Sequence, residues 1–323
     1  MSIIANIGDQ VVRNMNVSAL TKPITASSWE EAIEKADLNY HVEKLPLYYD
    51  APEAPHITTD SYATVRLDTN EYLGIVSERY RVLQNREAGI VFDSLIGNGM
   101  TIERAGSFKG GAVIFLQAKL PSSIDIKGDI VGKYFTIINS HDGSKKFSML
   151  TTPIRIICWN TLNTSLARAI AIKSVKHTKS IKINIEETRN MLGLIVNEYD
   201  LLEEAFKAFA NKQILGAEET HFAEMMFPTD EQKTMEENYK MLDSQKLLVK
   251  LHQSGTGSEL SRGTVWGLYN AATEMADHYM PVYKSRGFAP SEKQIESHLE
   301  SILLGEKAEF KKRAFNVAKE MLV

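Results

Sequence analysis

The chain has 323 residues, of which 43% are hydrophobic and 24% are charged, and its formal net charge is −4. These fractions are typical of soluble globular proteins and exclude a disordered chain, a collagen-like repeat or a coiled-coil rod. No apolar run approaches the ~18 residues that span a bilayer, the first residues lack a signal-peptide pattern, and the single cysteine excludes an internal disulfide. We therefore expect a cytoplasmic protein of roughly two domains that does not partner a membrane.

The charge is unevenly distributed along the chain. Residues 127–182 carry ten Lys and Arg against two Asp and Glu, a net charge of +8, whereas residues 1–126 sum to −5 and residues 183–323 to −7. Clustered cations that neutralise phosphates release counterions, which drives binding to nucleic acid. The alternative is that these side chains form a solvated face or pair with the acidic flanks.

The first half of the chain predicts hairpins beside short helices. Residues 1–27 show no sustained period and are expected to form an N-terminal arm, and a capping box at Ser28 and Glu31 opens a helix over residues 29–36. A strand is expected over residues 40–49, and a helix follows Asn85. The alternation predicts three hairpins, which join residues 62–68 to 71–77, 100–107 to 112–120, and 133–140 to 145–159. A helix is then expected from residue 160 to about residue 172.

The second half predicts helices only. Apolar residues recur at helical spacing over residues 185–215, and further helices are expected over residues 230–253, 264–279, 291–304 and 306–322. The glycine-rich segment 255–263 lacks phosphate-loop spacing and is interpreted as a loop between helices. The predicted fold class is α+β, in which an antiparallel sheet of hairpins with flanking helices over residues 28–182 precedes an all-helical domain over residues 183–323. We expect the helical domain to mediate association between copies of the chain, so a homo-oligomer is a candidate state.

Catalytic signals are weak. The eight histidines are scattered and no metal-binding or nucleotide-binding motif occurs, so neither a metal nor a cofactor is expected. His141 and Asp142 lie in a predicted hairpin turn where Asp-Gly is ordinary turn chemistry, and they are the weak catalytic candidates together with His177. Cys158 lies in an apolar run and is expected to be a core residue. The run Lys311–Lys312–Arg313 is expected to form an exposed polar face.

The basic segment carries a pattern suited to single-stranded nucleic acid. Aromatic residues alternate with cations on its predicted strands, where bases stack and phosphates meet positive charge. Trp159 precedes Asn160 at a predicted helix start, where first-turn N–H groups favour an anion. The alternative is that about half of the aromatic side chains simply face the core. The candidate nucleic-acid-binding residues are Lys133, Lys145, Lys146, Arg155, Trp159, Asn160, Arg168, Lys173, Lys176, His177 and Lys179.

Several longer motifs resemble a known family. They are NSHDGS (139–144), TPIRIICWNTLN (152–163), KHTKSIKINIEETRNMLG (176–193), GTVWGLYNAATEMADHY (263–279) and ILLGEKAEFKKRAF (302–315). These segments resemble the phage/plasmid-like family, domain of unknown function 932, whose members are typically encoded by prophages, phages and conjugative plasmids. The resemblance implies an accessory protein of mobile DNA and carries no assigned activity. At fold level only, hairpins with a basic surface are similar to phage single-strand annealing recombinases.

Three hypotheses follow from the sequence. The leading one is a non-catalytic accessory protein of phage or plasmid origin that binds single-stranded DNA, with an annealing or recombination factor as its specific form. The first alternative is a counter-defence protein whose basic segment meets an acidic host protein. The second is a nuclease or other hydrolase that uses His141, Asp142 or His177.

Overall fold

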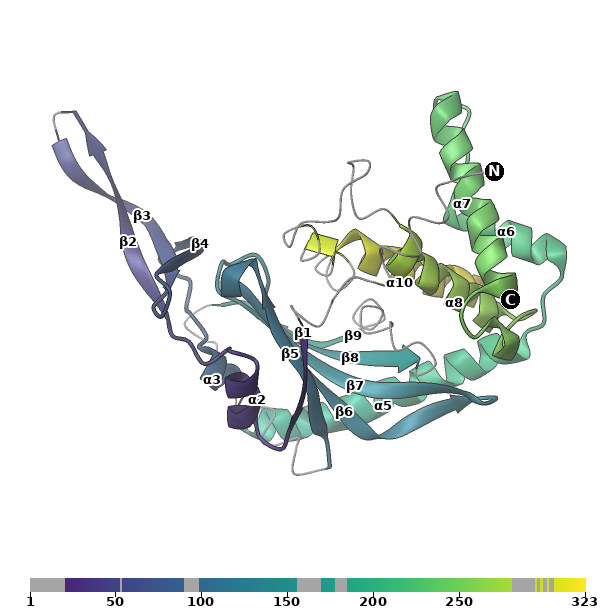
Figure 1. Cartoon of the computed structure of the whole chain (residues 1–323), viewed down its shortest axis with the longest axis horizontal. Coiled ribbons are helices and arrows are strands. Elements are labelled where there is room, and N and C mark those ends of the chain that lie inside the picture. The colour runs from purple at the N-terminus through teal and green to yellow at the C-terminus, as the bar shows by residue number, and fades with distance from the viewer. Residues whose placement is uncertain are drawn as a thin grey trace.

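The computed structural model describes residues 21–52, 54–89, 99–155, 170–177, 185–280, 294, 297–298, 301 and 305–323. Within these residues a six-stranded sheet and a three-stranded sheet, both antiparallel, precede a series of helices (Figure 1). The α+β class predicted from the alternation of hydrophobic residues is therefore confirmed.

The larger sheet is a meander with one added edge strand. Its order is β1-β5-β6-β7-β8-β9, and all neighbours pair antiparallel. The strands are Thr21–Ala26 (β1), Thr101–Phe108 (β5), Val113–Ile126 (β6), Asp129–Ser140 (β7), Phe147–Arg155 (β8) and Ile170–Val175 (β9). The predicted β5–β6 and β7–β8 hairpins are confirmed.

The longest pairing in this sheet, β6 with β7, was not predicted. It runs from Val113 opposite Ser140 to Ile126 opposite Asp129. The turn between them is the two-residue loop Lys127–Gly128, and both residues have positive φ, 54° and 89°. This is the backbone that a tight hairpin with right-handed strand twist requires, and glycine adopts it without strain.

The smaller sheet forms a projection that we call the arm, which is distinct from the N-terminal arm expected over residues 1–27. Its strands are Val42–Ala51 (β2), Ala54–Arg66 (β3) and Glu71–Ser77 (β4), in the order β2-β3-β4, which confirms the predicted β3–β4 hairpin. In Figure 1 the β2–β3 hairpin extends away from the rest of the molecule. Leu45, Ala63 and Ile75 lie opposite one another across the three strands, and two of the three side chains are exposed.

Two short helices lie between the sheets. The helix Trp29–Lys35 (α2) begins after Ser28, whose hydroxyl accepts the Glu31 N–H at 3.2 Å as the capping pattern predicts. The helix Asn85–Ala88 (α3) has Gln84 as its cap instead of Asn85. The Asn85 side chain is directed elsewhere, because its Nδ2 donates to the Leu38 carbonyl.

The second half of the chain is helical. The helices are Ile185–Asn211 (α5), Gly216–Met226 (α6), Met235–Ser254 (α7), Val265–Glu274 (α8) and Glu306–Glu320 (α10), and a π-helical turn, Met275–Tyr279, continues α8. The segment predicted as one helix over residues 185–215 thus ends at Asn211, and α6 was not predicted. The predicted helix over residues 291–304 lies mostly outside the described residues.

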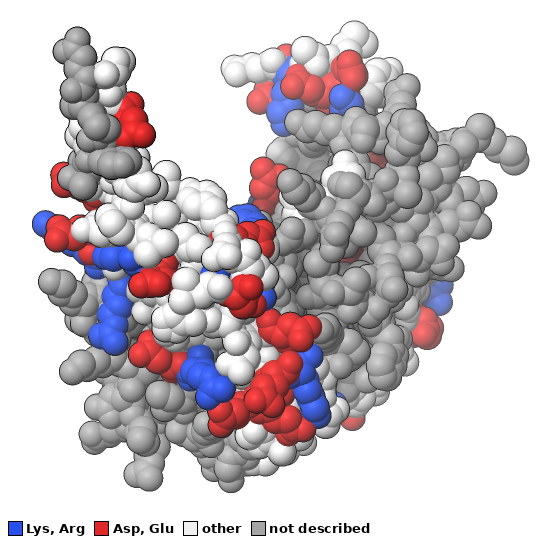
Figure 2. All heavy atoms as spheres, turned by 60° about the vertical axis from the view of Figure 1, so that its left-hand side comes forward, with Lys and Arg blue, Asp and Glu red and all other residues white. Residues whose placement is uncertain are grey.

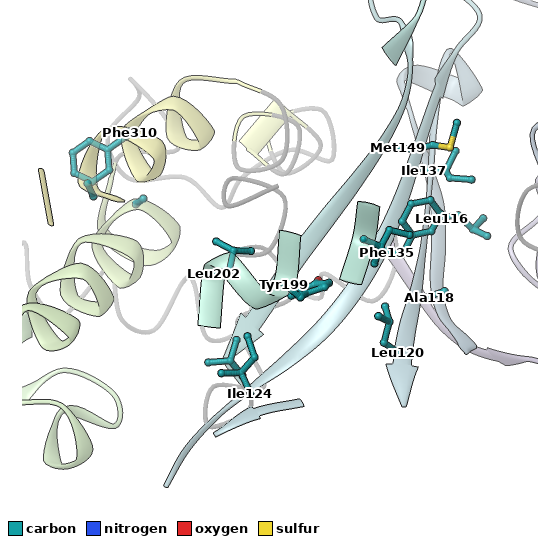
Figure 3. Close-up of a cluster of buried hydrophobic side chains, with 14 of the residues drawn as sticks. Leu116, Ala118, Leu120, Ile124, Phe135, Ile137, Met149, Tyr199, Leu202 and Phe310 are labelled. Carbon is teal, nitrogen blue, oxygen red and sulfur yellow. The ribbon is translucent and has the colours of Figure 1, made fainter. Parts of the chain in front are cut away.

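One hydrophobic core joins the sheet to the helices. Figure 3 shows Leu116, Phe135 and Ile137 of the strands on one side and Leu202 of α5 on the other. At the junction, Trp266 of α8 donates its indole N–H to buried Asp129 of β7 at 2.8 Å. Buried residues of the strands and of the helices thus belong to one contiguous cluster.

Tyr199 of α5 fixes the helix to the middle of the sheet. The β6–β7 register shifts between Lys119 and Ser123, next to Tyr134. The Tyr199 hydroxyl accepts the Tyr134 N–H at 2.7 Å and donates to the Tyr134 carbonyl at 2.6 Å. A buried side chain thus satisfies main-chain groups beside an irregularity in the ladder.

Three predictions about secondary structure and burial were wrong. Residues 21–26 form strand β1 instead of belonging to an irregular arm, and residues 170–172 belong to strand β9 instead of a helix. Lys311 is fully buried, although Lys312 and Arg313 are exposed as expected. A run of three cations predicts a solvated face, but Lys311 has a buried partner, Asp277, in another helical segment.

That partner belongs to a group that we call the Asp277 cluster: Asp277, His298, Lys307 and Lys311. The fully buried Lys311 ammonium and Asp277 carboxylate form an ion pair. Lys307 donates to the Met280 carbonyl at 3.0 Å and lies 2.8 Å from His298 Nδ1. Burial lowers the pKa of Lys307 to about 8 and that of His298 to about 3.

Candidate functional site

A pocket of about 380 Å³ lies where the arm meets the β7–β8 turn and the end of β9. Its lining residues come from three separate segments of the chain. They are Ser77, Arg79, Tyr80, Gly143, Ser144, Lys145, Lys146, Lys176 and His177.

One wall is the β7–β8 turn, which local hydrogen bonds hold in shape. The Ser140 hydroxyl accepts the Lys145 N–H and donates to the Lys145 carbonyl, both at 3.1 Å. Asp142 Oδ1 accepts the Ser144 N–H at 2.9 Å, and Gly143 has a φ of 73°. This is an Asx turn completed by glycine, and it fixes the backbone that presents Lys145.

The arm is packed against this turn at a glycine. A Cβ atom at Gly74 of β4 would lie 2.7 Å from the Asp142 Cβ and 2.8 Å from its Cα. Any other residue at Gly74 would therefore displace either the strand or the turn. This close contact places the Ser77–Tyr80 segment, which begins at the last residue of β4, beside the turn.

The opposite wall is formed by Tyr80 and His177. Their rings are stacked at a centroid distance of 5.0 Å, and the Tyr80 hydroxyl donates to the Ser140 carbonyl at 2.6 Å. The Arg81 N–H donates to the His177 carbonyl at 3.1 Å, and His177 Nδ1 lies 3.2 Å from the Arg81 carbonyl. The segment that follows β9 is thereby tied to the segment that follows β4.

The Arg81 contact defines the tautomer of His177. A carbonyl oxygen can only accept a hydrogen bond, so Nδ1 carries the proton and Nε2 of the neutral ring is an acceptor. Nε2 is buried and has no hydrogen-bond partner within the part of the chain that the structure describes. Burial also lowers the pKa of His177, which keeps the ring neutral at pH 7.

His141 lies beneath the turn, where its hydrogen bonds connect the turn to other parts of the core. Its Nε2 donates to Asn85 Oδ1 at 2.9 Å, and its main-chain N–H donates to the Ala112 carbonyl at 2.6 Å. The side chain is fully buried and does not line the pocket, and burial lowers its pKa to about 3. The geometry suits a neutral core histidine that supports the turn.

Four cations line the pocket, and none of them has an acidic partner among the described residues. Arg79, Lys146 and Lys176 are exposed and Lys145 is half-buried. None of the four has a carboxylate oxygen within 4.0 Å among the described residues. Like charges held together in this way repel one another, so an anion placed among them would be stabilised.

All of the predicted residues except Lys133 fall into three groups. Lys145, Lys146, Lys176 and His177 meet in the pocket, and Asp142 and His141 lie in the adjoining turn. Arg155 ends β8 and Lys173 lies on β9, three residues before Lys176. Trp159, Asn160, Arg168 and Lys179 lie outside the described residues, as does Cys158.

Lys133 lies apart from the pocket. It is seven residues from Ser140 on β7, which is ~23 Å at ~3.3 Å per residue. Its ammonium group lies 3.6 Å from the Glu203 carboxylate of α5 and 5.6 Å from the centre of the Tyr199 ring. The Lys133 ammonium group therefore already has partners on α5, where that helix packs against β7.

Sequence reasoning missed Ser77, Arg79 and Tyr80. They lie in the acidic first part of the chain, so a count of charge by segment assigned them no role. The available signal was the run Glu78–Arg79–Tyr80–Arg81 directly after the strand expected over residues 71–77. Lys44 holds this run in place, because its ammonium donates to the carbonyls of Glu78 and Tyr80.

The described residues offer no metal-binding cluster. No group of three or more His, Cys, Asp or Glu side chains in the described ranges could hold a metal ion. Among the helices in those ranges, none is long and apolar enough to cross a membrane.

Comparison with known proteins places the chain in a family. The model of the family described as "Domain of unknown function (DUF932)" matches residues 72–303. The chain belongs to the DUF932 family. Neither the search of curated proteins nor the search of solved structures found a match. The matched region contains every residue that lines the pocket and also Asp277 and His298.

Proposed function

We propose that this DUF932 protein is an accessory nucleic-acid-binding protein of phage or plasmid origin that holds single-stranded DNA by its phosphates. The observation that supports this proposal most directly is the convergence of Arg79, Lys145, Lys146 and Lys176 on one pocket without described acidic partners. Annealing or recombination is the specific form of the proposal, because such proteins must hold a single strand while leaving its bases free to pair.

The size of the pocket favours a single strand. At about 380 Å³ it lies at the lower end of the ~300–1,000 Å³ range of small-molecule sites. One phosphate with its sugar fits such a volume, whereas a duplex requires an extended surface. The Tyr80 ring is already stacked on His177, so the pocket offers charge more than a free platform for a base.

A salt titration tests the proposal. Single- and double-stranded oligonucleotides are titrated at several salt concentrations with the unmodified protein and with the Lys145→Ala, Lys146→Ala double variant. Each phosphate contact contributes ~0.7 to the slope of log affinity against log salt for a single strand, so the double variant should bind more weakly with a slope lower by about one to two. Base sequence should matter little, since lysines contact charge and not base edges.

The matched control is the Lys240→Ala, Lys246→Ala double variant on α7. Both lysines are highly exposed and lie on a helix far along the chain from the pocket. This variant removes the same charge and should leave affinity and slope unchanged. An unmodified protein that binds no oligonucleotide in a salt-sensitive way would contradict the proposal and favour an acidic protein partner for the pocket.

The hydrolase hypothesis is tested in the same samples. Divalent cations are added and the oligonucleotides are examined for cleavage. Robust cleavage that is lost in His177→Asn but retained in the α7 control would replace the binding proposal by a catalytic one.

A further inference from the structure

The arm has an inner face, which packs against the β7–β8 turn, and an outer face on its other side. Successive side chains of a strand point to opposite faces of a sheet. Thr64 and Val76 are buried on the inner face, where Gly74 lies against Asp142. An antiparallel sheet that is covered on one face usually carries polar side chains on the other, so apolar residues on the outer face indicate that another surface covers them.

The strand register collects apolar side chains on this outer face. The face contains two neighbouring rows with one residue from each strand: Leu45, Ala63 and Ile75, then Glu43, Val65 and Tyr72. A register shift keeps Tyr72 and Ile75 on the same face although they are three residues apart. Leu45 is 39% exposed, Tyr72 57% and Ile75 59%. Exposed apolar side chains grouped in this way mark a contact with another surface.

The chemistry of the two rows favours a protein as the partner. A single strand of nucleic acid stacks its bases on successive aromatic rings beside cations, whereas Tyr72 is the one aromatic residue in the two rows. A membrane surface attracts cations, whereas the one charged residue in the rows is Glu43. Aliphatic side chains such as Leu45 and Ile75 instead match the apolar face of another sheet.

The charges at the two ends of the outer face indicate which protein fits. Glu43 and Glu71 are exposed at the end where β4 begins. Ser77, at the end where β4 stops, lies on the same face as Ile75 and lines the pocket with its four cations. A second copy that lies antiparallel on this face brings its acidic end over the basic end, whereas a parallel copy brings like charges together.

We propose that the outer face of the arm packs against the same face of a second copy of the chain, with a two-fold axis that crosses the strands at the row Leu45, Ala63 and Ile75. Each residue of this row then meets its own counterpart, as an isologous interface requires, and the two sheets stack ~10 Å apart. Figure 2 turns the side of the molecule from which the arm projects toward the reader, and uncharged surface lies there between acidic and basic groups. This inference goes beyond the proposed function, because it concerns association of the chain without any ligand.

Sedimentation of the unmodified protein over a range of concentrations tests the association. A dimer is expected, and Ile75→Asp should weaken it at least about 30-fold, because the two-fold axis places two carboxylates in one apolar contact. Tyr72→Asp in the other row should act in the same direction. Both side chains are more than half exposed, so both variants should fold normally, which circular dichroism verifies. Met235→Asp on α7 replaces a side chain that is 77% exposed and should leave the dimer unchanged.

Charge reversal tests the direction of the second copy. In the antiparallel arrangement, Glu43→Arg places a cation over the basic end of the other copy and should weaken the dimer several-fold at low salt. Adding Arg79→Glu on the same chain should restore the dimer, because each copy then supplies both reversed charges. In a parallel arrangement Glu43→Arg merely exchanges one like-charged contact for another, so the single variant would have no effect.

Each other outcome contradicts a defined part of the proposal. A monomer at every soluble concentration would overturn it. A dimer that persists in folded Ile75→Asp and Tyr72→Asp, or one that is lost equally in Met235→Asp, would also overturn it and place the contact elsewhere. A dimer that is lost in Ile75→Asp and does not respond to Glu43→Arg would contradict the antiparallel direction. None of these measurements uses an oligonucleotide, so the proposed function is tested separately.

Discussion

Two groups of lysines in this molecule differ in their exposure to solvent and in their partners. In the pocket, Lys145, Lys146 and Lys176 are at least partly solvated and have no described carboxylate beside them. In the Asp277 cluster, Lys307 and Lys311 are removed from water, and each has a defined partner. Lysines of the first kind are available to an external anion, whereas those of the second kind are part of the folded core.

The strongest test of this contrast is the buried ion pair. Replacement of Lys311 by Met leaves the Asp277 carboxylate buried without its cation, and the free energy of unfolding should fall by about 3–5 kcal/mol. Chemical denaturation measures the loss. The neighbouring exposed Lys312→Ala variant should change stability by no more than ~0.5 kcal/mol. Adding Asp277→Leu to Lys311→Met should restore most of the stability; if it does not, the pair has another role.

A second expected effect is acid sensitivity at both sites. Burial lowers the pKa of His141, beneath the pocket, and of His298, in the cluster, to about 3. Unfolded histidine titrates near 6.5, so the unfolded chain binds more protons at pH 3–6.5. Stability should be complete above pH 6.5 and fall by up to ~1.4 kcal/mol per pH unit per histidine as the pH decreases toward 3. Urea midpoints at pH 7 and pH 5 measure this slope, which His141→Gln should reduce.

A smaller effect is expected on the alkaline side. The folded pKa of Lys307 is about 8 and the unfolded value is near 10.5, so the cost of burying its charge is fully present below pH 8. As the pH rises from 8 to 10.5 this cost disappears, and the unmodified protein should gain stability relative to Lys307→Met. Parallel denaturation curves at pH 7.5 and 9.5 measure the difference. An identical pH response in the two proteins would show that Lys307 is solvated.

The smallest effect on stability is expected in the pocket itself. Lys145→Ala with Lys146→Ala should change the free energy of unfolding by no more than about 0.5 kcal/mol for each substitution, because neither side chain has a described ion pair to lose. The same protein should show the reduced oligonucleotide binding described above. A loss above ~2 kcal/mol would mean that these lysines are structural and would remove the contrast with Lys311.

The sequence was informative where local patterns decide the structure. The β5–β6 and β7–β8 hairpins follow from alternating apolar residues around Gly-containing turns, and the helices from apolar residues at helical spacing. Strand β1 escaped prediction because six residues with a proline carry little pattern, and their pairing partner begins some 75 residues later, at Thr101. A strand at the edge of a sheet is specified by its neighbour more than by its own propensity.

Three of the nine pocket residues, Ser77, Arg79 and Tyr80, could not be predicted from local sequence for the same reason. Lys145, Lys146 and Lys176 were found because they are clustered in the sequence, whereas Arg79 and Tyr80 reach them only through contacts such as Tyr80 with Ser140 and Arg81 with His177. The burial of Lys311 was also not readable from AEFKKRAF, because it depends on Asp277 in a distant helix. Whether a charge is solvated is decided by its partners, which the chain brings together only on folding.

The Tyr199 hydroxyl has a consequence for how the sheet and the helix fit together. It accepts from and donates to a single residue, Tyr134, beside the place where the β6–β7 register shifts. This docking point exists only when the two strands are paired with that shift, since a slipped pairing would move Tyr134 away from the irregularity. The register of the β6–β7 hairpin and the position of α5 are therefore coupled, because the two Tyr199 hydrogen bonds form only when both are correct. Phenylalanine in place of Tyr199 would preserve the apolar contact and remove the two hydrogen bonds that fix the position of α5 along β7.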